Sequence, residues 1–166
     1  MSVLTSASAV VARRGTAASA LSAAAAALII IASLVAAEHL LGLAVFALPF
    51  VASAALIALA PSGPPARPGA VLRAYPAAAA TALPVTAVLG PGEVAVAASV
   101  VATVAMMAVL RAPHVPAALC AGGIGLTDPG LGYLPHTLIP AVVIVLVAAA
   151  AAGRVVPGFE YPLRSS

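Results

Sequence analysis

An arginine and a histidine stand three residues apart in a stretch of the chain that is otherwise apolar. Arg111 ends one apolar run, and His114 follows soon after it. A guanidinium group can hold an anion through its planar fork of N–H donors, and an imidazole titrates near neutral pH and can relay a proton. The same two residues could instead be a membrane-surface anchor and a cap for loop carbonyls. We interpret them as candidate substrate-binding residues.

Further candidates lie on either side of this pair. Arg73 stands at the start of another apolar run, and a glycine-rich segment follows His114. Glycine lets a backbone approach a solute closely, with its N–H groups free to donate. The predicted site for a small anion comprises Arg73, Arg111, His114, Gly122, Gly123 and Gly125.

The sequence carries no motif of an enzyme. It has no nucleophile elbow, no zinc-protease motif and no phosphate-binding glycine loop. Four acidic residues spread along the chain cannot form a cation cage, and the single Cys120 cannot form an intramolecular disulfide. We therefore expect no catalysis, no cofactor and no bound metal. With no Trp and no Lys in the chain, we also expect no nucleic-acid partner.

Composition places the chain in a lipid bilayer. Of its residues, 64% are hydrophobic and 7% are charged, whereas about a quarter of the residues in soluble domains are charged. Five apolar runs, at 17–37, 40–60, 74–89, 94–110 and 138–152, approach the ~20 residues that a membrane-crossing helix needs. The predicted fold is an all-α membrane protein, a polytopic bundle of five transmembrane helices.

Segment 117–136 does not fit a regular crossing helix. Its apolar part spans only about 11 residues, too few to cross, and glycines and prolines follow. Irregular backbone inside a membrane must be buried in protein or face water. We predict a short re-entrant or broken element here, in addition to the five crossing helices.

Arginine positions predict the orientation in the membrane. Cytoplasmic loops are enriched in Lys and Arg, so the arginines at 13, 14, 67, 73 and 111 are expected on the cytoplasmic side, with Glu38 and Glu93 on the other side. The same bias favours a crossing by 117–136, because a crossing would bring Arg154 and Arg164 to the cytoplasm. The length of the segment favours re-entry, and we predict re-entry.

Two loops share the pattern Ala-Pro-x-x-Pro-x-Ala, at 60–66 and 112–118. Internal repeats with broken helices at corresponding places are common in transporters. In a chain this rich in Ala and Pro, chance similarity is an equally good explanation.

The order of several motifs resembles that of a known family. Loop 63–68 reads Gly-Pro-Pro-Ala-Arg-Pro, Arg111 precedes His114-Val115-Pro116-Ala117-Ala118, and the chain continues with a Gly/Ala-rich region 122–132, an apolar run 138–152 and Tyr161-Pro162. From Leu48 to Pro162 the chain is similar to the HPP family of small integral membrane proteins, named for a His-Pro-Pro motif. Val115 stands where the family has the first proline of that motif, and Arg67 replaces a Gln.

The resemblance implies small-anion transport, because members of the family have been linked to nitrite movement across plastid and cyanobacterial membranes. We expect a multi-pass transporter or channel of the cell membrane for a small solute, with nitrite as the anion. The alternative is a non-transporting subunit or scaffold that packs against partner helices. Small residues on the apolar runs permit close helix packing, so homo-oligomers are compatible with either function.

The resemblance also divides the chain. We expect a cytoplasmic N-terminal segment at 1–16, an extra N-terminal transmembrane helix and turn at 17–39, an HPP-like transmembrane domain at 40–162 and a tail at 163–166.

Overall fold

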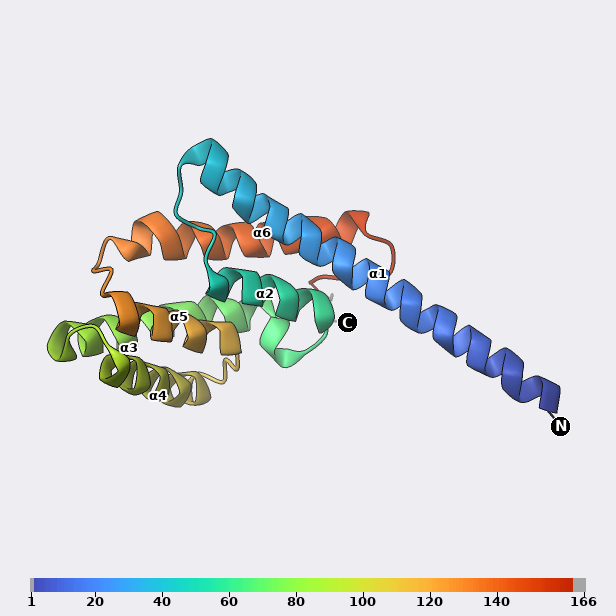
Figure 1. Ribbon diagram of the computed structural model, residues 1–166, viewed down its shortest axis with the longest axis horizontal. Helices are drawn as coiled ribbons and strands as arrows, with labels where there is room; N and C mark the ends of the chain where they lie inside the picture. Colours follow the sequence, from blue (N-terminus) through green and yellow to red (C-terminus); the bar gives the residue numbers. More distant parts are fainter. Residues whose placement is uncertain (1, 163–166) are drawn as a thin grey trace.

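The computed structural model describes residues 2–162, with side chains from Thr16 onward, so the predicted tail at 163–166 lies outside the described residues. Residues 2–162 form six α-helices, a 3-10 turn η1 and a π-helical turn η2 (Figure 1). In chain order the elements are α1 (Ser2–Leu41), α2 (Leu48–Leu59), η1 (Pro64–Ala66), α3 (Pro68–Leu89), α4 (Glu93–Val109), α5 (Val115–Thr127), η2 (Leu134–Leu138) and α6 (Ile139–Val155). These elements confirm the predicted all-helical class. The expected N-terminal segment 1–16 is continuous with α1 from Ser2 onward.

Helices α2 to α6 form a bundle, and α1 lies across it. The C-terminal half of α1 packs on α6, while its N-terminal half projects away from the other helices (Figure 1). Alanines fill much of the interior, and the largest fully buried side chains are those of Tyr75, Phe50, Ile30 and Leu34. Small interior residues let the helix axes approach closely.

Large apolar side chains also cover the outside of the bundle. Val88 is 82% exposed, Val109 79% and Leu28 68%. Three helical segments, Thr16–Leu41, Pro68–Leu89 and Leu134–Val155, are long and apolar enough to cross a membrane. An apolar exterior around an apolar interior is what a lipid solvent requires.

The remaining helices are shorter, and five crossing helices are not confirmed. α2, α4 and α5 contain 12, 17 and 13 residues. At about 1.5 Å per residue, α2 and α5 are roughly 20 Å long, less than the ~30 Å hydrocarbon core.

The predicted second span, 40–60, differs from the structure. α1 continues to Leu41, Gly42 adopts a positive φ of 65°, and an extended segment leads to Ala47 before α2 begins. Pro49, expected to kink a helix, instead occupies the first turn of α2. A proline lacks the N–H that a first-turn residue leaves unbonded, so it favours a helix start there.

The prediction of a broken element at 117–136 is wrong for its first half. α5 is a continuous helix, and the irregular backbone lies in the turn after Asp128, which has a left-handed φ of 45°, and in η2. The sequence-based expectation treated the glycines as helix breakers. In the structure Gly125 lies within α5, where α5 packs closely on α4.

α5 leads from η1 to the turn between α3 and α4. Its first residues lie against η1, where His114 contacts Pro65, and its last turn meets the α3–α4 turn, where the Gly92 N–H donates to the Gly125 carbonyl. α6 then runs back toward η1. The Tyr161 hydroxyl, beyond the end of α6, donates to the Ala66 carbonyl of η1. The C-terminal segment therefore ends beside η1.

This path separates most charges of the described residues; Glu160 is the exception, because the neighbouring Tyr161 bonds η1. Arg67, Arg73, Arg111 and Arg154 lie toward the end that carries η1. Glu38, Glu93 and Asp128 lie toward the opposite end, at the last turn of α1, the start of α4 and the end of α5. We call these the arginine end and the acidic end.

Candidate functional site: a buried polar centre

His114 caps the start of α5 from a fully buried position. It is 0% exposed, with Nδ1 2.8 Å from the Pro65 carbonyl oxygen and Nε2 2.8 Å from Ser53 Oγ. A carbonyl can only accept, so Nδ1 carries the proton that is donated to Pro65. In the neutral imidazole, Nε2 then accepts from the Ser53 hydroxyl.

Tyr75 of α3 completes this cluster. Its hydroxyl lies 2.6 Å from Ser53 Oγ and 2.9 Å from the Pro49 carbonyl oxygen; because the Ser53 proton is donated to His114, the single Tyr75 proton is shared between these two acceptors. Its ring is 5.4 Å from the rings of both Phe50 and His114. Ser53, Tyr75 and His114 thus join α2, α3 and α5 through hydrogen bonds inside an apolar bundle.

Every polar side chain of this cluster has a partner. Leaving one buried donor or acceptor unpaired costs about 1–3 kcal/mol, so the cluster specifies one arrangement of the three helices. Both ring nitrogens of His114 are occupied by protein atoms in this conformation. Sequence reasoning missed Ser53 and Tyr75, although each is a polar residue inside an apolar run.

A second polar pair lies near the first. Cys120 of α5 is 1% exposed, and its Sγ lies 3.3 Å from the Tyr133 hydroxyl. Tyr75 and Cys120 lie in the same buried core, and Tyr133 packs against it. We call Ser53, Tyr75, His114, Cys120 and Tyr133 together the polar centre.

The structure brings Arg73 and Arg111 together at the surface of the arginine end. Both side chains are exposed. Arg73 donates from Nη1 to the Leu110 carbonyl at 2.9 Å and from Nε to the Gly69 carbonyl at 2.8 Å. It thereby fixes the loop that carries Arg111 and, three residues later, the buried His114.

The predicted glycines lie elsewhere. A Cβ on Gly125 would stand 2.8 Å from the backbone of Val96, and one on Gly122 would stand 3.5 Å from a Val100 methyl group. Gly123 is exposed, with nothing within 4 Å of such a Cβ. Gly122 and Gly125 therefore serve the packing of α5 on α4, and the structure does not gather the three glycines with the arginines.

The C-terminal segment covers η1. The Tyr161 hydroxyl lies 2.9 Å from the Ala66 carbonyl oxygen. Burial raises the pKa of Tyr161 to about 12, which keeps this donor protonated. Gly153 of α6 touches the backbone of Tyr161, so a side chain at position 153 would displace the segment.

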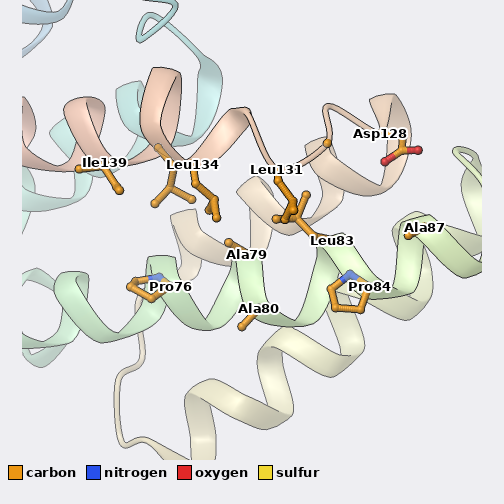
Figure 2. Close-up of a pocket in the computed structure, with 12 residues that line it drawn as sticks. Pro76, Ala79, Ala80, Leu83, Pro84, Ala87, Asp128, Leu131, Leu134 and Ile139 are labelled. Atoms are coloured by element: carbon orange, nitrogen blue, oxygen red, sulfur yellow. The ribbon is translucent and has the colours of Figure 1, made fainter.

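An apolar groove of about 590 Å³ separates α3 from the segment that leads into α6. Figure 2 shows Leu131, Leu134 and Ile139 on one wall, facing Pro76 and the following turns of α3. Asp128 at one end is the only charged residue of the lining. None of the six predicted site residues lines the groove.

An apolar exterior, charges divided between two ends and a buried polar centre define an all-helical integral membrane protein. The chain belongs to the HPP family, because the family model described as HPP, transmembrane region, matches residues 12–162. The match begins within α1, so the family region includes the helix that we expected to precede it. Comparisons with curated proteins and with solved structures found no match.

Proposed function

We propose that this chain is a multi-pass protein of the cell membrane that moves a small solute across the bilayer, and that the solute is a small inorganic anion such as nitrite. Transport, and not catalysis, is the activity proposed. Neither proposal requires a cofactor.

One observation carries the proposal of transport. α2 and α5 are both too short to cross, and their first turns lie side by side inside the bundle, where the cap of α5 contacts Ser53 of α2. Transporters commonly place short or broken helices of this kind around a solute site near the bilayer midplane. Polar side chains at this depth are costly and tend to have a function.

Two further features support an anion as the solute. Arg73 and Arg111 form an exposed cationic surface near the loop that precedes α5, and a surface of one charge sign raises the local concentration of the opposite ion. The resemblance to the HPP family implies nitrite in particular.

A second candidate function is a non-transporting membrane subunit. The observation that favours it is the burial of His114 at 0% exposure, among alanines and with both ring nitrogens bonded. A bundle held in this way could serve only to pack against partner helices.

Flux in sealed proteoliposomes distinguishes the two candidates. We expect vesicles that contain the full chain to take up nitrite faster than protein-free vesicles, with an initial rate that saturates as nitrite increases. Nitrate and chloride, tested in parallel, would define the selectivity. An uptake rate equal to that of protein-free vesicles would reject transport and favour the subunit.

The arginine surface is tested with a matched variant. We expect Arg73→Gln with Arg111→Gln to lower nitrite uptake at low ionic strength by about tenfold at subsaturating concentration. Arg67→Gln with Arg154→Gln removes the same number of charges from exposed side chains at the same end, and should leave uptake unchanged. Equal effects of the two changes would remove the assigned role of Arg73 and Arg111.

A further inference from the structure

The six helices divide into two halves with the same plan. Each half has a helix that leads into a short helix, followed by a 22-residue helical segment: α1, α2 and α3 in the first half, and α4, α5 and Leu134–Val155 in the second. Both short helices carry proline at their second position, Pro49 and Pro116. Three helices per half reverse the direction of the chain, so the second half is inverted relative to the first.

Helix packing follows the same correspondence between the halves, in which α1 is exchanged with α4, α2 with α5 and α3 with α6. α1 packs on α2 as α4 packs on α5, α1 packs on α6 as α4 packs on α3, and α2 packs on α6 as α5 packs on α3. The two remaining pairs, α2 with α5 and α3 with α6, join each helix to its own counterpart. Figure 1 shows α2 and α5 extending in opposite directions from the middle of the bundle. This pattern is that of a two-fold axis between the halves.

The polar centre also divides between the halves. Counted from the starts of α2 and α5, Ser53 and Cys120 occupy the same position. Ser53 bonds the Tyr75 hydroxyl, and Cys120 bonds the Tyr133 hydroxyl. In each half, a small polar side chain on the second turn of the short helix meets a phenol. Tyr75 lies within α3, whereas Tyr133 stands just before the segment Leu134–Val155.

The two halves are not identical. His114 caps α5, and its counterpart before α2 is Ala47. The Ala-Pro-x-x-Pro-x-Ala similarity between 60–66 and 112–118 does not follow the exchange, because the first segment comes after α2 and the second leads into α5. The repeat is therefore one of structure, with little sequence similarity.

We propose that the protein is an inverted repeat and that its solute binds between the halves, against the Ser53–Tyr75 pair of one and the Cys120–Tyr133 pair of the other. This inference rests on the proposed transport function and locates its site. The O–H and S–H groups of these four side chains bond one another or neighbouring protein atoms in this conformation. Turned toward a solute they would act as donors, which fits a small hydrogen-bond acceptor such as an oxyanion. Exchanging the conformations of two inverted halves would open such a site to the other membrane face.

The apolar groove between α3 and the start of α6 lies where the halves meet on one side. Its walls come from both halves: Pro76, Leu83 and Pro84 from the first, and Leu131, Leu134 and Ile139 from the second (Figure 2). A gap of about 590 Å³ at this contact leaves space for one half to shift against the other.

The single native cysteine of the chain makes the site testable. We will compare the unmodified chain, whose thiol is at position 120, with the double change Ser53→Cys and Cys120→Ser, which moves the thiol to the equivalent position. Both proteins are placed in proteoliposomes at neutral pH, and their labelling by N-ethylmaleimide is timed with sodium nitrite or with sodium gluconate at equal ionic strength. Ser62→Cys with Cys120→Ser, which puts the thiol on an exposed loop, is the control.

We expect nitrite to slow labelling at both positions by about tenfold when its concentration is about ten times its Kd, and to leave labelling of the control unchanged.

Protection at only one of the two positions, protection at neither, or no labelling of either thiol would overturn the shared site. If uptake of nitrite persists in that case, the proposed transport stands and only its location is rejected. Protection at both positions without uptake would keep the site and reject transport.

Discussion

His114 joins three segments of the chain through the two nitrogens of its ring. Nδ1 bonds the loop after α2, Nε2 bonds Ser53 in α2, and the residue itself caps α5. A histidine used in this way supports the helices around it. In the proposed transport, His114 would act by holding Ser53 in position.

The Ser53 hydroxyl is the shared member of the cluster, so its removal should destabilise the protein. Ser53→Ala leaves Nε2 of His114 and the Tyr75 hydroxyl without one partner each. We expect a loss of about 1–3 kcal/mol in the free energy of unfolding, measured as a lower melting temperature in detergent. Ser62→Ala, at an exposed serine, should leave the melting temperature unchanged. Equal melting temperatures of the two variants would show that the cluster contributes nothing to the free energy of unfolding.

Val115 should accept the proline that the family motif has at this position. It is the first residue of α5 and 71% exposed, and proline is favoured at the first position of a helix. His114, with φ −114° and ψ 89°, lies outside the α region that is disfavoured for a residue before proline. We expect Val115→Pro to stabilise the protein by about 0.4–1 kcal/mol. A lower melting temperature than that of Val115→Ala would contradict this.

At the residue scale, the sequence predicted which polar residues stand out, but not what they contact. Arg73, Arg111 and His114 were chosen for their chemistry, and the structure places them around one loop. The contact between His114 and Ser53 spans 61 positions. No local pattern encodes such a pairing, so the burial of His114 could not be read from its neighbours in the sequence.

At the scale of elements, the glycines of α5 differ in whether helix packing requires them. Gly125→Ala would place a Cβ 2.8 Å from the backbone of Val96 and should push α5 away from α4. Overpacking of this kind typically costs about 1–3 kcal/mol.

Gly123→Ala is the matched control, two residues earlier on the same helix. The position is exposed and open, so alanine should stabilise the helix by roughly 0.5–1 kcal/mol. Thermal melting of both variants in detergent checks the pair. Destabilisation by both, or by neither, would contradict the packing of α5 on α4.

Helix boundaries were predictable where an apolar run was long and ended near a charge or at a Gly-Pro-Gly turn. The expected runs at 74–89, 94–110 and 138–152 correspond to α3, α4 and α6 within a few residues at most ends. The starts of α2 and α5 were not predictable, because hydropathy does not distinguish extended from helical backbone inside an apolar run. The prolines at 49 and 116 were the available signal, since both stand in a first turn.

At the scale of the whole molecule, charge and fold agree on one orientation. The sequence left a conflict between the length of 117–136, which favoured re-entry, and the arginine bias, which favoured crossing. The structure brings the C-terminal segment back to η1 through the Tyr161–Ala66 bond. Arg154 therefore joins Arg67 at the arginine end, as the positive-inside bias requires.

The central claim is that the chain lies in a membrane with its arginine end on one side and its acidic end on the other. The most direct test uses Cys120→Ser as a background in sealed vesicles of known orientation. Single cysteines replace Arg67, Arg154 and Glu93, and a membrane-impermeant maleimide is added from outside before and after the vesicles are opened. We predict that positions 67 and 154 are labelled from the same face and position 93 from the opposite face. Labelling of all three from one face, or of 67 and 154 from different faces, would contradict the account.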